Sequence, residues 1–304
     1  MRKWVLKAVV QKAISYLPAS QKINQFFQKH VTKGLALTDQ LFEDKLNHFH
    51  HHWRAFCEHS ISDHSAFRAF ELGTGWYPIV PIMLFIHGAE KVFTWDVQSL
   101  LQGNHLQSTI GKFLAYHDQG RLQIPDNSRK VLQDCYKELD RSSIEQVLSQ
   151  MHIVPMVGDA RQTGIYDNSI DISFSNNTFE HIDALMLRQI LLEMKRFAKP
   201  DGVMSHFIDL TDHFSHLDKE ISSLHFLKYS PAQWRLIDNA IQPQNRLRIT
   251  DYRSLYKEVD IPINKEQNFY VTEEDFAMAH LHDQFKTIPE EDLMVSHSYL
   301  VSRM

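Results

Sequence analysis

Apolar and polar positions follow two different rhythms on either side of residue 65. Before it, apolar residues recur at helical spacing, which predicts one helix ending at Pro18 and a second over 39–58. After it, short apolar runs alternate with helical patterns. These runs predict strands at 66–72, 91–96, 152–157, 170–175 and 203–210. Such alternation is typical of a mostly parallel sheet with helices on both faces.

Helical patterns fill the spaces between these strands. Only helices are expected between residues 98 and 150, and a helix over 183–198 is stopped by Lys199-Pro200-Asp201-Gly202. After residue 210 the rhythm changes. Ser230-Pro231-Ala232-Gln233 is a capping box that predicts a helix near 231–240. Further helices are expected after Thr250 and Thr272, and late strands at 267–271 and 294–301.

We therefore predict an α/β fold, with a Rossmann-like, mostly parallel seven-stranded sheet whose last strand is antiparallel. The predicted domains are a helical N-terminal extension over 1–64 and a second domain over 65–304. Helical insertions are expected in that second domain at about 104–150 and 211–262. These segments would cap the sheet.

Composition and charge place limits on the class of protein. Hydrophobic residues make up 43% and charged residues 23%, as in ordinary globular proteins. The two cysteines, Cys57 and Cys135, form no metal or disulfide motif, so a reducing cytoplasm is the simplest compartment. The net charge of −5 disfavours a nucleic-acid partner, because phosphate binding needs a basic face.

The first 38 residues are basic and contain no acid. Their charged residues are Arg2, Lys3, Lys7, Lys12, Lys22, Lys29 and Lys33. A solvated helix face explains this stretch most simply, and a peripheral contact with an anionic membrane is the alternative. Lys7 interrupts the apolar run, so no secretory signal is predicted, and no stretch reaches the roughly 20 apolar residues of a membrane span.

The strongest local motif is the turn that follows the first predicted strand. It reads Glu71-Leu72-Gly73-Thr74-Gly75. The two glycines allow a sharp turn and a close approach to a ligand, and a helix start offers N–H groups to an anionic group. Nicotinamide-binding enzymes share this feature, but they carry a small residue at the position of Pro78, which makes that assignment a poor match.

Further polar residues follow the later strands. Asp96 ends the second strand, where a carboxylate can accept both hydroxyls of an adenosine ribose or serve as an ordinary N-cap. Asp159 and Ala160 follow the third strand, where they can bound an adenine ring or form a simple turn. Asn176 and Asn177 end the fourth strand, at the sheet edge where ligands bind in open α/β folds.

In this order, the motifs resemble the class I S-adenosylmethionine (SAM)-dependent methyltransferases over about residues 65–210. The resemblance implies that Gly73, Thr74 and Gly75 hold the methionine part of SAM, with Glu71 at its amino end. Tyr77 replaces a glycine often seen in the family, which alters the wall at that end. The remaining roles implied are ribose binding by Asp96, adenine contacts by Asp159 and Ala160, and a place beside the methyl donor for Asn176, with Asn177 as a further cofactor-binding candidate.

The segments after the fifth strand would belong to the substrate side. Four residues there are candidate substrate ligands: Tyr229, Trp234, Arg246 and Arg248. The chain also resembles bacterial methyltransferases of small-molecule or cell-surface glycan pathways. We therefore expect methyl transfer to a small-molecule or glycan acceptor, with oxygen as the acceptor atom. The alternatives are a nicotinamide-dependent oxidoreductase or epimerase, and a SAM-binding protein without catalysis.

An oxygen nucleophile must lose a proton, and histidine is a suitable base near neutral pH. His213, oriented by Asp209 or Asp212, is the first candidate, and His181 is the second. Each can equally be a polar residue of a loop at a strand end. Asp209, Asp212, His213 and His216 can also bind a divalent ion, but this spacing is a weak signal, and no metal site is predicted.

A second group of histidines lies in the N-terminal extension. His48 and His52 are one helical turn apart, at a spacing that can hold a metal ion. A solvated helix face is the preferred interpretation of this group, with Phe49, Trp53 and Phe56 in the core.

Overall fold

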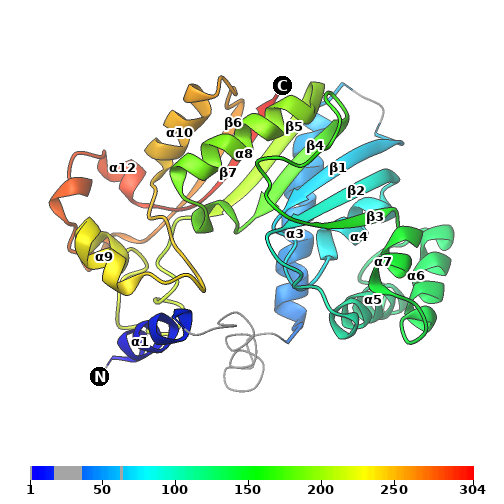
Figure 1. The fold of residues 1–304 in the computed structure, drawn as a ribbon, viewed down its shortest axis with the longest axis horizontal. Helices are drawn as coiled ribbons and strands as arrows, with labels where there is room; N and C mark the ends of the chain where they lie inside the picture. The colour runs from blue at the N-terminus through cyan, green and yellow to red at the C-terminus, as the bar shows by residue number, and fades with distance from the viewer. Residues whose placement is uncertain (1, 17–35, 62–63) are drawn as a thin grey trace. The chain divides into compact units, whose positions relative to one another are not determined.

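The computed structural model describes residues 2–16, 36–61 and 64–304 (Figure 1). Lys22, Lys29, Lys33 and the predicted helix end at Pro18 lie outside the described residues. The chain divides into two compact units. Unit 1 comprises residues 1–36, 177–188 and 207–300, and unit 2 comprises 37–176, 189–206 and 301–304.

Seven strands form one sheet in the order β3-β2-β1-β4-β5-β7-β6. Their bounds are β1 (Phe67–Leu72), β2 (Ala89–Asp96), β3 (Ile153–Val157), β4 (Ile170–Asn176), β5 (Ala198–Asp209), β6 (Lys265–Tyr270) and β7 (Val295–Arg303). β1 is parallel to β2 and β4, and β2 is parallel to β3. Backbone hydrogen bonds from Met304 to Gly202 and from Leu210 to Ser296 show that β7 is antiparallel to β5. The predicted fold class is confirmed.

Five helices of unit 2 precede β4 in the chain. They are α3 (Asp39–His59), α4 (Ile79–Ile86), α5 (Gly103–Asp118), α6 (Asp126–Glu138) and α7 (Ile144–Gln150). The purely helical pattern predicted between 98 and 150 therefore corresponds to α5, α6 and α7, which pack one on the next with α7 against β3 (Figure 1). α8 (Ala184–Phe197) follows β4. Pro78 lies at the N-cap of α4, one residue before the helical position expected for it.

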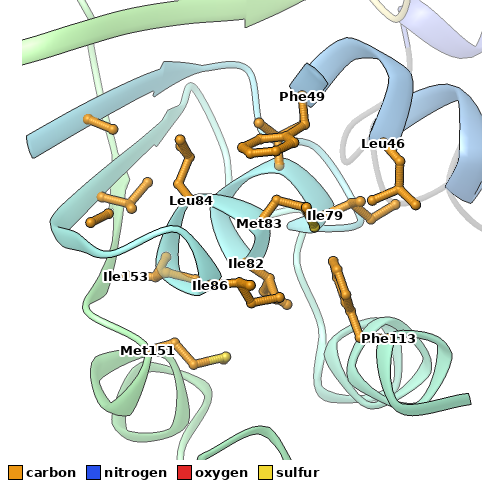
Figure 2. Close-up of a cluster of buried hydrophobic side chains, with 14 of the residues drawn as sticks. Leu46, Phe49, Ile79, Ile82, Met83, Leu84, Ile86, Phe113, Met151 and Ile153 are labelled. Atoms are coloured by element: carbon orange, nitrogen blue, oxygen red, sulfur yellow. The ribbon is translucent and has the colours of Figure 1, made fainter. Parts of the chain in front are cut away.

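The core of unit 2 is built around α4, which is apolar on all sides. Ile79, Ile82 and Met83 are almost completely buried, and Phe49 of α3 packs on the same cluster (Figure 2). A helix that is apolar all round is stable only when covered on every side. Burying each such side chain contributes about 1.5–3 kcal/mol to the stability of the fold. Because α3 supplies part of the cover on α4, it belongs to the core of unit 2.

The sequence suggested that the Lys199–Gly202 segment separates α8 from the next strand. In the structure it does not. β5 begins at Ala198 and includes it. Asp201 has a φ of 67°, and a Cβ on Gly202 would lie 2.8 Å from the Lys199 carbonyl oxygen. The turn is paired with the chain end, because Asp201 N donates to Met304 O at 3.1 Å and Arg303 forms an ion pair with Asp201. This pairing makes the turn part of the strand.

Unit 1 contains short helices joined by long loops. They are α1 (Lys3–Ser15), α9 (Pro231–Ile237), α10 (Ile249–Glu258), α11 (Glu273–Ala277) and α12 (Glu290–Leu293), with single turns at Phe179–His181, His225–Lys228 and Asp283–Phe285. The capping box predicted for α9 is confirmed, with Ser230 Oγ accepting from Gln233 N at 3.2 Å. The helix ends earlier than predicted, because the side chain of Asn239 accepts from the next backbone N–H groups and forms a turn.

The basic residues of α1 are only partly solvated. Lys12 Nζ donates to the carbonyl oxygens of Arg235 and Asp238 at the end of α9, at 3.0 and 2.6 Å. Lys7 Nζ lies 5.5 Å from the centre of the Phe214 ring. The prediction of a solvated basic face is wrong for these two lysines, which bind their own unit. In the described part of the chain, no helix combines the length and apolar character needed to cross a membrane.

Candidate cofactor and acceptor sites

The turn after β1 leaves open space beside its backbone. Gly73 and Gly75 have φ angles of 79° and 73°, in the left-handed region that favours glycine. Gly73 N donates to Trp95 O at 2.8 Å, which fixes the turn to β2. A Cβ placed on Gly75 would meet no atom within 4 Å. The glycines are therefore required by the turn, and the space beside Gly75 can receive a ligand.

Glu71 is a buried carboxylate at the end of β1. Its Oε2 atom has no hydrogen-bond partner among the described residues. Burial raises the pKa of Glu71 to about 7, and the positive charge of Lys45 offsets only part of this effect. A buried acid in this state gains from a cationic group of a ligand.

Asp96 connects the turns that follow β1 and β3. Its Oδ2 atom accepts from Gly75 N at 3.2 Å, and its backbone oxygen accepts from Gly158 N at 3.0 Å. Burial raises the pKa of Asp96 to about 6, although the backbone N–H groups of Gly75 and Thr74 oppose the shift. The carboxylate lies at the carboxyl edge of the sheet, as predicted, where it can accept hydroxyl groups.

Asp159 and Ala160 follow β3, and they differ in exposure. Ala160 is buried, whereas the Asp159 carboxylate is exposed and accepts from Arg161 Nε at 2.9 Å through each oxygen. Arg161 lowers the pKa of Asp159 to about 2. Asp159 therefore forms an ion pair with its own loop, beside an open surface cavity of about 590 Å³ that Gln189 and Arg196 also border.

Tyr77 is half-buried beside an aromatic group that the sequence did not indicate. The His105 ring lies edge-on to Trp76 and Tyr77, with centroids 5.1 and 5.3 Å apart. His105 comes from α5, so the predicted wall at this end of the turn includes a residue of the helical 98–150 region. No motif marks His105, because its role depends on the packing of α5.

Asn176 is buried at the end of β4, and a histidine of α3 holds it. Asn176 Oδ1 lies 2.9 Å from His52 Nε2, and Ser205 Oγ lies 2.8 Å from His52 Nδ1. Burial lowers the pKa of His52 to about 4, so the ring is neutral, with its proton on Nε2 facing the amide oxygen. The predicted solvated face is therefore wrong for His52, and both its nitrogens are bonded to protein groups, which leaves none for a metal ion. Asn177, in contrast, is exposed, with a φ of 49°.

In unit 1, two imidazoles lie beside the Asp209 carboxylate. His213 Nε2 lies 3.4 Å from one of its oxygens, and His297 Nε2 lies 3.5 Å from the other. Burial opposes ionisation of Asp209, but His213, His297 and the Thr211 hydroxyl outweigh it and lower its pKa to about 2. The ring centres of His181 and His213 are 5.1 Å apart, so the structure brings these two candidate bases together.

Asp212 does not orient His213. It is fully buried, accepts from Phe214 N at 2.8 Å, and lies 3.3 Å from His225 Nδ1. Of the two carboxylates considered for orienting His213, the structure places Asp209 in that position.

Three of the candidate substrate residues lie together, two aromatic rings and one guanidinium group. The Arg246 guanidinium lies 5.2 Å from the Trp234 ring centre, and the Tyr229 ring lies 6.4 Å from the same ring. Trp234 and His213 border one small cavity, together with Lys7 and Gln11 of α1. No motif in the sequence indicates that α1 lines this cavity.

Arg248 is separate from this group and has no exposed surface. Its guanidinium donates to the carbonyl oxygens of Leu210, Leu293 and Val295. These bonds join the end of β5 to the start of β7. Arg248, a candidate substrate ligand in the sequence, therefore stabilises the fold.

The turn of unit 2 fits the cofactor that the motifs imply. SAM carries a cationic amino group, which suits the buried Oε2 atom of Glu71, and ribose hydroxyls, which suit Asp96. The open space at Gly75 gives the methionine part room beside the backbone. All three features belong to one unit and do not depend on the acceptor.

Comparison with known proteins supports this interpretation. Residues 115–205 match the sequence model of a family described as a methyltransferase domain. A search of the curated proteins found no match. The family match, together with the sheet order, confirms the resemblance drawn from the motifs. Residues 115–205 are thus similar to a methyltransferase domain, and SAM is the expected cofactor.

Solved structures with a similar fold cover most of the chain at low identity. One is provisionally described as a sarcosine dimethylglycine methyltransferase, from Galdieria sulphuraria (15% identity, 86% of this chain and 87% of that chain, TM-score 0.48). Another is geranyl diphosphate C-methyltransferase from Streptomyces coelicolor A3(2) (10% identity, 87% and 83%, TM-score 0.47). A third is a SAM-dependent methyltransferase from Mesorhizobium loti (13% identity, 83% and 97%, TM-score 0.41).

Proposed function

We propose that this chain transfers a methyl group from SAM to a hydroxyl oxygen of a small-molecule or glycan acceptor. The observation that carries the proposal is the turn after β1, which has open space at Gly75 and two acids beside it, the buried Glu71 and the half-buried Asp96. Among the residues that the structure describes, neither acid has a cationic partner that restores its ordinary pKa. The turn is therefore suited to a ligand with both an ammonium group and hydroxyl groups.

The acceptor side of the proposal rests on unit 1. His213 and Asp209 form a pair that can bind and activate a hydroxyl group, and His181 lies beside them. Tyr229 is half-buried beside Trp234 and Arg246, which are both buried, so Tyr229 is the member of this group that can offer part of its ring and its hydroxyl to a polar acceptor. These features favour a hydroxylated acceptor over an apolar one.

When bound, SAM supplies an electrophilic methyl group on a sulfonium. The chain has to hold the donor and the acceptor oxygen in line, and such positioning alone can supply about 7–11 kcal/mol of the barrier. Glu71 would hold the amino group of the donor, and Asp96 would hold its ribose. The bond from His52 to Asn176 gives the amide at the end of β4 a single orientation. The buried, neutral His52 holds this amide without adding charge.

The test is calorimetric titration with SAM, S-adenosylhomocysteine and NAD, repeated with Asp96→Ala. We expect micromolar binding of both sulfur ligands and none of NAD. Because the variant loses charged hydrogen bonds to two hydroxyls, its affinity for both should fall by about 100-fold or more. Binding of NAD alone would support the oxidoreductase alternative instead. Binding of SAM without methylation of any hydroxylated acceptor would favour a protein that binds SAM without catalysis.

A peripheral membrane contact is a second, narrower part of the proposal. Arg2, Lys3, Leu6 and Val9 are exposed on α1, unlike Lys7 and Lys12. An apolar strip flanked by basic residues can lie on an anionic lipid surface. We expect Lys3→Glu with Leu6→Glu to weaken binding to anionic vesicles at low salt by about tenfold or more. Equal binding of the variant and the native protein would rule this contact out.

A further inference from the structure

Glu180, His181 and His213 form a compact cluster in unit 1. One potential ligand atom from each lies within 4.8 Å of the other two. Glu180 is buried and the two histidines are half-buried. Glu180 and His181 belong to the single turn after β4, and His213 belongs to the loop after β5. Segments far apart in the sequence thus bring two imidazoles and one carboxylate together.

The hydrogen bond of His181 determines which of its nitrogens keeps a lone pair for a metal ion. His181 Nδ1 lies 2.6 Å from the carbonyl oxygen of Pro243, which can only accept. Nδ1 therefore carries the proton, and Nε2 keeps its lone pair. Metal-binding histidines characteristically donate their second N–H to a backbone carbonyl or a carboxylate in this way, which fixes the ring.

His213 has a similar arrangement with a carboxylate. Its Nε2 lies 3.4 Å from Asp209 Oδ2, and its Nδ1 lies 3.3 Å from Gln242 Nε2. A proton on Nε2 donates to Asp209 and leaves Nδ1 as the ligand atom. Gln242 is then the group that a bound ion would displace. Asp209 is thus placed to support a metal ligand through its second nitrogen.

We propose that Glu180, His181 and His213 bind a divalent transition-metal ion, with Zn²⁺ as the best fit. Two imidazoles and one carboxylate form the ligand set of several catalytic zinc sites, which keep a fourth position open. Ligand atoms around zinc are about 3.4 Å apart, so the side chains need to close by only a little over 1 Å. Imidazole nitrogens disfavour Mg²⁺ and Ca²⁺, which prefer oxygen ligands.

The catalytic role of this ion rests on the proposed function. A hydroxyl of the acceptor would take the open position, where the ion lowers its pKa and its proton passes to solvent. In methyl transfer to that oxygen, the methyl–sulfur bond would break as the oxygen–methyl bond forms, and the sulfur would leave as a neutral thioether. In the metal-bound protein His213 is a ligand, and it is not the base that the sequence suggested.

The first experiment measures metal binding alone, on the full chain after dialysis against a chelator. Co²⁺ is the optical probe, because four-coordinate Co²⁺ absorbs strongly in the visible range, and Zn²⁺ is then titrated in competition. We expect about one ion per chain, with Zn²⁺ displacing Co²⁺ and Mg²⁺ failing to do so. No visible band, or displacement by Mg²⁺ as readily as by Zn²⁺, would overturn the proposal.

Variants then test the ligand set. His181→Ala and His213→Ala should each abolish the Co²⁺ band, and Asp209→Asn should weaken Zn²⁺ binding about 10–100-fold through His213. His216→Ala is the matched control, since this imidazole lies beside His213, with ring centres 5.4 Å apart, but outside the cluster. It should leave the band unchanged. Loss of the band in His216→Ala, or its retention in both ligand variants, would show that this cluster is not the site.

SAM binding by the same proteins separates this inference from the proposed function. Glu71 and Asp96 belong to unit 2, so calorimetric SAM binding should be the same in the ligand variants as in the native protein. SAM binding without metal binding would overturn only the metal site. Methylation that is unchanged after complete removal of the metal would return His213 to the role of base.

Discussion

Buried charged side chains occur in both units, and their surroundings differ. In unit 2, burial raises the pKa of Glu71 to about 7 and that of Asp96 to about 6. In unit 1, the imidazoles around Asp209 lower its pKa to about 2 despite burial. Unit 1 thus balances its buried charges with its own side chains. Unit 2 keeps acids that gain their full stabilisation only when a ligand brings a cation or hydroxyl groups.

Arg248 is the strongest test of the unit 1 side of this comparison. Its buried guanidinium donates to three carbonyl oxygens. Arg248→Met keeps most of the volume but leaves these carbonyls without donors, so we expect the free energy of unfolding to fall by about 3–5 kcal/mol. Urea unfolding followed by circular dichroism measures this loss. A loss below about 1 kcal/mol would mean that water replaces the guanidinium and that Arg248 is available to a substrate.

Glu71 should behave in the opposite way to Arg248, because its replacement should stabilise the folded protein. The pKa of Glu71 in the folded protein, about 7, lies above its unfolded value of 4.5. The folded state therefore holds a proton that the unfolded chain releases, and stability is lost as the pH rises from 4.5 through 7. At pH 8 and without ligand, Glu71→Gln should raise the free energy of unfolding by about 1–3 kcal/mol.

The same variant should weaken SAM binding, because an amide cannot pair with an ammonium group. A gain in stability together with a loss of affinity is the signature of an acid reserved for a ligand. Thermal unfolding and calorimetry on one preparation measure both. A variant that is less stable than the native protein at pH 8 would mean that Glu71 is a structural acid.

The pH dependence of SAM affinity follows from the same group. Below its pKa of about 7, Glu71 is neutral and has to lose its proton before it can pair with the amino group of SAM. Affinity should therefore fall about tenfold between pH 8 and pH 6. Calorimetry across this range, with Glu71→Gln as the control, separates Glu71 from other titrating groups. An equal slope in the variant would assign the dependence elsewhere.

The sequence predicted those parts of the fold and sites that depend on local order. The glycine turn and the capping box at Ser230 were identifiable because turn and cap residues act within a few positions of one another, and Asp96 was identifiable because it ends a predicted strand. His52 and His105 were missed, since their roles arise from packing across more than 20 residues of sequence. Glu180 was missed as well, and its adjacency to the candidate base His181 was the one sequence signal that could have drawn attention to this cluster.

Substitution of Asp159 should have the smallest effect on SAM binding of the changes considered. It tests how far the contrast between the acids of the two units holds. It is the one acid of the predicted cofactor site that already has a cation, because Arg161 pairs with it on the surface. Asp159→Asn should weaken SAM binding by less than about fivefold, since exposed ion pairs contribute little and an adenine contact is a single hydrogen bond. Asp96→Ala, measured in parallel, should have a much larger effect. If the two losses were equal, Arg161 would have to release Asp159 when the ligand binds, and the acids of unit 2 would act together regardless of their partners in the free protein.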